Sequence, residues 1–426
     1  MLSSGLWSFL ILGLALRDVQ RGVRDMKADF VEPAQRLTFC HTETSVKNGL
    51  IYHLFPGNME HHTPTMIRFF LNNHSHWNHD RNAYRFVVFG SRDENKSKYD
   101  IIELNAGQII QLPPSTRSLM RWLRGLAKGD QLVMHSAFMS KIWAMLLLNP
   151  RLWRRTAWVM WGADILKRPS IKGRIYARIK RIVIPRLGAV SALVPGEYNL
   201  LKSLYGPADN YVRAFYPIKV EINNTDAELD KIGLTRPLRV LLGNSAWDAN
   251  NHEEALRWLS RFANEDIEIV CPLGYPAESE YKTKVISLGE NLLERKFVAI
   301  REMLDNIEFW KLAGSCDLLI LNNLNQQGLA SVYFMLFQGK KIYLRPENPT
   351  FQMMKDFGIE AYSSLDLAHI SFKEFANYRE EIVQRNLNQA EEHLSPNASI
   401  RGWRDLFHRL SPKTVSKRKL IECAKL

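Results

Sequence analysis

The chain has 426 residues, enough for two domains of ordinary size, and its 46% hydrophobic and 24% charged residues are typical of a globular protein. Its net charge of +13 favours anionic partners such as nucleic acid, anionic lipid or phosphorylated substrates. The sequence has no zinc-finger spacing, aromatic RNA-binding signature or basic heptad region, so no nucleic-acid partner is predicted. The four cysteines form no CxxC pair, which argues against structural zinc and fits a reducing cytoplasm.

Residues 1–47 form an N-terminal extension in which an apolar run, residues 5–16, precedes several basic side chains. A membrane-spanning helix needs about 20 apolar residues, so this run is too short. No basic residue precedes it, which argues against a signal peptide. A short apolar helix followed by cations can lie in a membrane interface. The alternative is a packed or poorly ordered extension.

Apolar runs alternate with helix-like segments between residues 48 and 220, which we interpret as one domain. Strands are predicted at residues 49–54, 84–89, 131–135, 157–161 and 189–194, and helices at 65–72 and about 138–148. This alternation predicts a parallel, doubly wound sheet. Such a sheet places its site at the carboxyl ends of the strands.

Polar residues near these strand ends are the candidate catalytic groups of the first domain. Asp164 follows the strand at 157–161, where burial would raise its pKa and suit it to act as a general base. Its alternative role is to cap the next helix. His61 and His62 follow the first strand and are rival bases, although each could equally be structural. No metal-ligand spacing such as HExxH occurs, so neither a metal nor a cofactor is predicted.

Residues 167–186 are strongly basic, and isoleucines recur among the cations at helical spacing. This pattern predicts an amphipathic basic helix. It fits either contact with an anionic membrane surface or a solvated cationic face on a helix that packs against the core.

The most informative stretch, residues 238–256, begins a second domain that we place at residues 236–395, after a crossing at 207–236. An apolar strand, 238–242, leads into Gly243, Asn244 and Ser245, and a helix pattern begins after Asn251 at His252. A helix N-terminus offers free N–H groups that suit a phosphate, and glycine allows close approach. The alternative is an ordinary turn in an Asn-rich loop.

Further strands are predicted at residues 267–271, 317–321 and 341–344, with a connection at 297–303 and a helix at 307–313. Residues 396–426 are predicted to form a C-terminal helix and a basic tail. The polar candidates at the ends of these strands are Gly274, Tyr275, Gln326, Gln327, Gly328, Arg345, Glu347 and Asn348.

The predicted fold class is therefore α/β, with two doubly wound, Rossmann-like domains facing each other across a cleft. This is the GT-B arrangement of many nucleotide-sugar glycosyltransferases. Dehydrogenases share the doubly wound motif, but no GxGxxG follows any strand, and the GxxxxGK[ST] of P-loop proteins is also missing.

Six stretches support a closer resemblance, to the bacterial glycosyltransferase family 56, from about Gly49 to about Trp403. In order they are YHLFPGNMEHHTPTMIRFF, WGAD, LLGNSAWDANNHEEAL, CPLGYP, NNLNQQGLAS and LRPENPTFQMM. The resemblance implies a metal-independent GT-B enzyme. It further implies transfer of a 4-acetamido-4,6-dideoxygalactose (N-acetylfucosamine) from a TDP-sugar donor to an undecaprenyl-diphosphate-linked saccharide, as in enterobacterial common antigen synthesis on lipid II. The place of action would be the cytoplasmic face of the inner membrane, with the protein held peripherally.

This resemblance assigns the donor to the second domain and the acceptor to the first. We expect Asp164, or else His61 or His62, to deprotonate the acceptor hydroxyl. The diphosphate would be stabilised by the turn at Gly243, by His252, by the helix start at residues 326–328 and by Arg345. Glu347 and Asn348 would bind ribose or sugar hydroxyls. The alternatives are a non-catalytic GT-B-like binding protein, or transfer from another nucleotide sugar in O-antigen or capsule synthesis.

Overall fold

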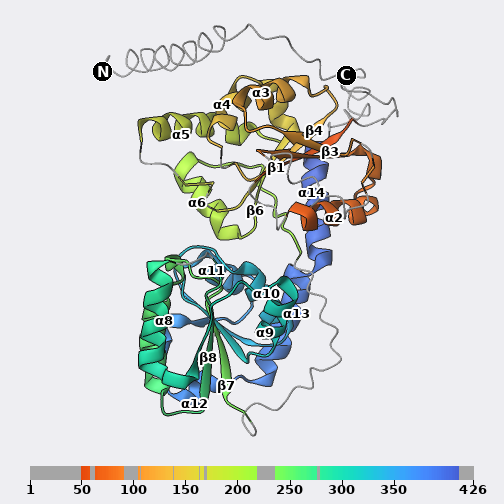
Figure 1. Cartoon of the computed structure of the whole chain (residues 1–426). Helices are drawn as coiled ribbons and strands as arrows, with labels where there is room; N and C mark the ends of the chain where they lie inside the picture. The colour runs from red at the N-terminus through yellow and green to blue at the C-terminus, as the bar shows by residue number, and fades with distance from the viewer. Residues whose placement is uncertain are drawn as a thin grey trace, which may run out of the picture.

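The computed structural model describes residues 49–57, 63–90, 104–105, 107–137, 139–162, 164–166, 170–217, 236–275 and 279–411. They form two lobes, each built on a six-stranded parallel sheet (Figure 1). The strand orders are β3-β2-β1-β4-β5-β6 and β12-β11-β10-β7-β8-β9. Both sheets therefore have the same doubly wound order. The order in which strands are added reverses between β1 and β4 in the first sheet and between β7 and β10 in the second. The predicted α/β fold is confirmed, whereas the predicted extension at 1–47 lies outside the described residues.

The strands of the first sheet are β1 (Ile51–Pro56), β2 (Tyr84–Phe89), β3 (Ile109–Leu112), β4 (Gln131–His135), β5 (Thr156–Met160) and β6 (Ala189–Ala192). Those of the second are β7 (Leu238–Leu242), β8 (Ile267–Pro272), β9 (Phe297–Ile300), β10 (Leu318–Leu321), β11 (Lys341–Leu344) and β12 (Tyr362–Ser363). The strands β4, β5 and β10 are buried along their whole length because helices cover both faces of each sheet.

The helices of the first lobe are α2 (Thr63–Asn73), α3 (Thr116–Gly125), α4 (Lys141–Leu147), α5 (Ile171–Val183) and α6 (Pro195–Tyr205). The remaining helices are α7 (His252–Leu259), α8 (Glu280–Leu293), α9 (Asn306–Gly314), α10 (Leu329–Phe337), α11 (Pro349–Asp356), α12 (Phe372–Ala376), α13 (Glu380–Leu394) and α14 (Pro396–Leu410). No helix in the described ranges is long and apolar enough to cross a membrane.

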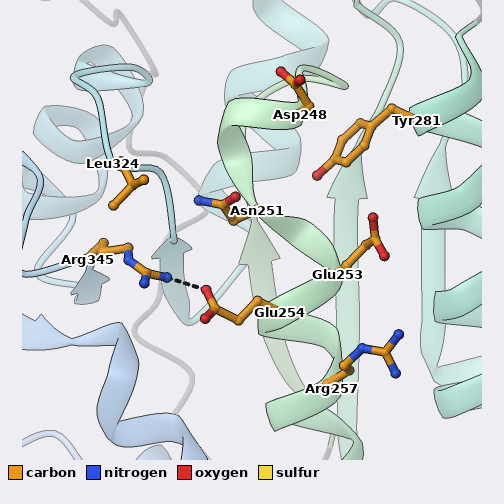
Figure 2. A pocket seen from close by; sticks show the side chains of 8 residues that line it. All are labelled: Asp248, Asn251, Glu253, Glu254, Arg257, Tyr281, Leu324 and Arg345. Atoms are coloured by element: carbon orange, nitrogen blue, oxygen red, sulfur yellow. Dashed lines mark hydrogen bonds and ion pairs between the residues drawn. The ribbon is translucent and has the colours of Figure 1, made fainter.

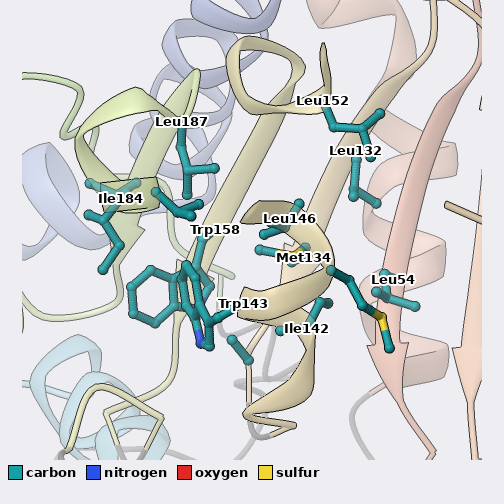
Figure 3. Close-up of a cluster of buried hydrophobic side chains, with 14 of the residues drawn as sticks. Leu54, Leu132, Met134, Ile142, Trp143, Leu146, Leu152, Trp158, Ile184 and Leu187 are labelled. Atoms are coloured by element: carbon teal, nitrogen blue, oxygen red, sulfur yellow. The ribbon is translucent and has the colours of Figure 1, made fainter. Parts of the chain in front are cut away.

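One face of the first sheet packs against α3, α4 and α5 through a cluster rich in leucine and tryptophan (Figure 3). Trp143 of α4 meets Trp158 of β5 edge to face, with ring centroids 4.7 Å apart. Edge-to-face contact is the favoured geometry of aromatic pairs, since it brings a positive ring edge to a negative ring face. Both rings are fully buried, which fixes α4 and the carboxyl end of β5 relative to one another.

The last helix of the described residues, α14, leaves the second lobe and joins α2 on the other face of the first sheet (Figure 1). Trp403 and Phe407 are buried there against Phe70 of α2. The indole N–H of Trp403 donates to the Phe215 carbonyl at 2.9 Å, and that of Trp77 donates to the Ile400 carbonyl at 3.0 Å. Helix α14 therefore completes the hydrophobic core of the first lobe.

The lobes also touch where α6 faces α11. A Cβ placed on Gly196, in the first turn of α6, would lie 3.0 Å from Pro349 Cβ, in the first turn of α11. Both helices start at the carboxyl ends of their sheets, so these two edges face one another (Figure 1). Arg213 adds a second contact by donating to the His393 carbonyl at 2.8 Å.

Three details of the predicted elements were wrong or missed. Residues 297–303, predicted as a connection, contain the edge strand β9, and the edge strands β3 and β12 were not predicted. The predicted crossing at 207–236 begins too early. Residues up to 217 stay on the first lobe, where Tyr211 pairs with Val190 and Ser191 Oγ donates to the Ala214 carbonyl at 2.9 Å.

Candidate active site

The turn after β7 lies where the second sheet reverses its strand order. Gly243 has φ of +73°, which disfavours any residue with a Cβ, and its N–H donates to the Ile320 carbonyl at 2.9 Å. A Cβ on Gly243 would lie 2.2 Å from Nε2 of His252. Backbone conformation and the imidazole beside it therefore both require glycine here.

His252, the first residue of α7, is fully buried beneath this turn. Its backbone N–H donates to the Tyr281 hydroxyl at 3.0 Å, and that hydroxyl lies 3.1 Å from Nδ1. The Tyr281 hydroxyl can donate its hydrogen to Nδ1, and in that tautomer the imidazole proton lies on Nε2. Nε2 has no hydrogen-bond partner among the described residues. Burial lowers the pKa of His252 to about 4, so at neutral pH it is an uncharged N–H donor directed at the Gly243 turn.

The start of α10 stands opposite, at the end of the neighbouring strand β10. Gly328 precedes this helix with φ of +66°, and a Cβ there would lie 3.3 Å from Asn244 Oδ1. Asn244 Oδ1 and Gln327 Oε1 are both buried without a hydrogen-bond partner in the part of the chain that the structure describes. The structure therefore brings together residues 243–244, His252 and residues 327–328. Gln326 lies in the same loop.

Buried amides hold these two loops in place. Asn251 adopts a left-handed conformation, with φ of 49°, and its Nδ2 donates to the Asn322 carbonyl at 3.0 Å. Asn250 Nδ2 donates to Ser245 Oγ at 3.2 Å. Asn348 donates to the carbonyls of residues 323 and 325 at 2.8 and 3.0 Å and caps α11 through the Thr350 N–H. Asn251, Ser245 and Asn348 are thus part of the framework of the site, and the whole Asn348 amide is already used.

A cavity of about 510 Å³ opens beside the turn, between α7, the start of α8 and the end of β11 (Figure 2). Arg345 points into it and is paired with Glu254, with Glu347 3.4 Å from its Nε. Asn322 Nδ2 also donates to Glu254, at 2.9 Å. The Arg345 charge is already balanced by carboxylates, whereas the Glu347 side chain is half exposed and available to a ligand. The cavity is lined by Asp248, Asn251, Glu253, Glu254, Arg257, Tyr281, Leu324 and Arg345.

The loop after β8 lies farther along the same edge. A Cβ on Gly274 would lie 2.0 Å from the Glu302 carbonyl oxygen, so this glycine allows two loops to pass closely. Tyr275 is 55% exposed, and its ring meets that of the exposed Trp247 at 6.5 Å. These two rings form an exposed aromatic pair.

Asp164 is only 5% exposed and holds the end of β5 to the end of β4. Its carboxylate accepts hydrogen bonds from the backbone N–H of Ala137 at 2.7 Å, from Trp158 Nε1 at 2.9 Å and from the Trp161 N–H at 3.0 Å. Burial raises its pKa, as expected, and these three bonds oppose the rise. These contacts give Asp164 a structural part at the strand ends, and its role as base stays a prediction. His61 and His62 lie outside the described residues.

Sequence reasoning missed two contributors: Glu254, which pairs with Arg345, and Tyr281, which hydrogen-bonds His252. Glu254 could have been found from its place in the helix start after Asn251. Tyr281 gave no signal, since it lies at an ordinary helix start. Among the described residues, no group of three or more His, Cys, Asp or Glu is placed to hold a metal ion.

Comparison with solved structures places this geometry in a known class. A glycosyltransferase from Rickettsia africae matches at 13% identity and TM-score 0.62, over 85% of this chain and 98% of its own. HepE from Anabaena, solved with UDP and glucose, matches at 11% and 0.57, over 84% and 99%. The lipopolysaccharide outer core galactosyltransferase WaaB matches at 12% and 0.58, over 84% and 99%. The fold is that of the GT-B glycosyltransferases.

The family is given by the sequence. Residues 48–409 match the family model described as 4-alpha-L-fucosyltransferase, glycosyl transferase group 56. The chain belongs to this family and is a nucleotide-sugar-dependent glycosyltransferase.

Proposed function

We propose that this enzyme transfers a 4-acetamido-4,6-dideoxygalactose-type sugar from TDP to an undecaprenyl-diphosphate-linked saccharide. The reaction belongs to bacterial surface polysaccharide synthesis and takes place at the cytoplasmic face of the inner membrane. The family description and the six ordered motifs support this substrate pair. The observation that carries the proposal is the pair of glycine turns, Gly243 and Gly328, which face each other at the switch point of the second sheet.

The donor diphosphate would bind at these turns. Nε2 of His252 lies beside Gly243 without a hydrogen-bond partner among the described residues, and the partial positive charge at the N-terminus of α10 stabilises an anion. As the bond to the sugar breaks, negative charge grows on the departing phosphate, so the same donors stabilise the transition state. Arg345, Glu347 and the aromatic pair at Tyr275 lie along the same edge, where nucleoside and sugar would extend.

The first lobe would face the lipid-linked acceptor, and α5 would contact the membrane. Ile171 is 70% exposed and Ile182 is 40% exposed on this helix. Both lie on one helical face, where arginines flank them and α5 carries no acidic residue. Exposed apolar side chains surrounded by cations suit the surface of an anionic bilayer.

Replacement of Gly243 tests the donor site. In Gly243→Ala, the new Cβ collides with His252, so we expect TDP affinity, measured by calorimetry, to fall at least tenfold. Gly206→Ala is the matched control, because Gly206 also has positive φ but no atom within 4 Å of its Cβ position. Equal TDP affinity in both variants would contradict the site.

The reaction itself is tested by TDP release from the TDP-sugar with the lipid-linked saccharide as acceptor. Wild-type protein is expected to release TDP only when the acceptor is present. TDP binding without release, with any lipid-linked acceptor, would favour a non-catalytic binding protein. Release from a different nucleotide sugar would favour O-antigen or capsule synthesis.

A further inference from the structure

The surface where the lobes meet contains a buried acid that the donor site does not use. Glu197 is the third residue of α6 and is 3% exposed. Its neighbour Gly196 is the residue that touches Pro349 of the second lobe. Glu197 therefore lies at the carboxyl edge of the first sheet, one residue from the contact between the lobes.

The Glu197 carboxyl is short of partners. Neither oxygen makes a hydrogen bond of normal geometry with any described residue. A Cβ on Gly162, in the WGAD loop, would lie 2.7 Å from Oε1, so any larger residue there would collide with this buried oxygen. An unsatisfied buried carboxyl costs free energy, and such groups in native structures generally have a functional cause.

Residues of both lobes interact electrostatically with Glu197. Its pKa is raised to about 8, chiefly by burial and also by the negative Asp164, while the backbone N–H groups of residues 194 and 193 oppose the rise. Glu197 also interacts electrostatically with Tyr211 and with Tyr333 of α10. Arg213 acts on the same two tyrosines and stacks 4.1 Å above the Phe215 ring.

Tyr333 also lies at the contact between the lobes, because its ring meets that of Phe215 with centroids 6.4 Å apart. Tyr333 is the fifth residue of α10, the helix whose start would hold the diphosphate. Glu197 thus approaches the donor site from the first lobe, which is the side assigned to the acceptor. Three donors already occupy the Asp164 carboxylate, which favours Glu197 over Asp164 for this place.

We propose that Glu197 is the catalytic base that accepts the proton of the acceptor hydroxyl when acceptor enters between α6 and the start of α10. The acceptor O–H bond breaks and its proton passes to a Glu197 oxygen. The electron pair of the acceptor oxygen forms the bond to the anomeric carbon. The bond from that carbon to the diphosphate breaks, and its electron pair leaves with TDP.

This assignment rests on the proposed function, and Glu197→Gln tests it. Glutamine has nearly the same shape and is as good as glutamate at the third position of a helix, but it does not accept a proton. We expect turnover to fall at least about 100-fold, with TDP affinity and KM within about twofold of wild type. In wild type kcat should rise with pH through about 8, and the residual rate of the variant should not.

Stability separates a catalytic role from a structural one. The folded Glu197 has a higher pKa than the unfolded one, so its ionisation destabilises the fold as pH rises from about 4.5 to 8. Glu197→Gln removes this cost, and its melting temperature at pH 8 or above should equal or exceed that of wild type. The matched control is Glu374→Gln, at the same position of the distant helix α12.

Three outcomes decide the matter. Wild-type protein that turns over no TDP-sugar overturns the proposed function. Active wild type together with a Glu197→Gln variant within fivefold of its rate, and with the same pH profile, overturns only the Glu197 assignment. A parallel loss of melting temperature and turnover in Glu197→Gln, but not in Glu374→Gln, assigns Glu197 a structural part and overturns the assignment as well.

Discussion

Asp164 receives three hydrogen bonds from groups on two neighbouring loops, and this number defines its role. A carboxylate that accepts three bonds has few lone pairs left for a substrate proton. Its backbone carbonyl is used too, because it accepts from Lys180 Nζ at 2.8 Å. The residue therefore organises the WGAD loop, which in turn places Gly162 beside Glu197.

Asp164→Asn should accordingly affect the stability of the fold more than the turnover rate. The asparagine Nδ2 is a donor placed where donors already converge, so at least one buried N–H loses its acceptor, at a cost of about 1–3 kcal/mol. We expect a melting temperature several degrees lower, with TDP affinity kept and most turnover retained by the folded protein. Abolished turnover at an unchanged melting temperature would return the role of base to Asp164.

Among the elements, α5 is unusual because it places isoleucines in solvent. Its buried side contains Lys180 and Val183, while its exposed face carries Ile171 and Ile182 with Arg174, Arg178 and Arg181 beside them. Burial of the isoleucines against a bilayer would remove this apolar surface from water.

The double variant Arg174→Glu with Arg178→Glu tests this face. Each cation near an anionic surface contributes about 1 kcal/mol, so binding to vesicles containing phosphatidylglycerol should weaken more than tenfold in a sedimentation assay. Lys373→Glu with Arg379→Glu makes the same change in charge on the second lobe and should have little effect. Equal losses in both double variants would show that only net charge matters.

The sequence predicts the bounds of the inner strands much better than it predicts the edge strands. The strands β2, β4, β7 and β11 begin and end at the predicted residues, because strands buried on both faces are continuous apolar runs. The edge strands β3, β9 and β12 have two to four residues with partly exposed side chains, so they lack that pattern.

The site divides in the same way. Residues at the ends of the central strands were predicted from the general rule for doubly wound sheets, and residues 243–244, His252 and residues 327–328 do come together. Glu197 and Tyr281 depend on contacts between elements that are distant in sequence. No local pattern distinguishes them from other acids and tyrosines at helix starts.

For the whole molecule, the buried histidines make stability depend on pH. Burial lowers the pKa of His79 and of His252 to about 4, and those of His53 and His135 lie well below the ordinary value. These pKa values are lower in the folded state, so the unfolded chain binds more protons below pH 6.5. Stability is therefore complete above that pH and is lost as the pH falls toward 4.

The free energy of unfolding should thus decrease between pH 6.5 and 5. His252 alone contributes up to about 2 kcal/mol over this range, since one pKa unit corresponds to about 1.4 kcal/mol. Chemical denaturation of His252→Gln should show a shallower decrease than wild type. The exposed His369→Gln should behave as wild type. A decrease that is identical in all three proteins would exclude His252 as a source.

The return of α14 to the first lobe has a consequence for biosynthesis. Trp403, Leu406, Phe407 and Leu410 belong to the same apolar cluster as Ile51 and Phe55, so the first lobe cannot complete the burial of that face until the ribosome has released α14. Throughout translation of the second lobe, the part of that face which α14 covers is open to water and to chaperones. The nascent enzyme is therefore most prone to aggregation just before its last helix emerges, and a stop codon near residue 395 would leave that state permanent.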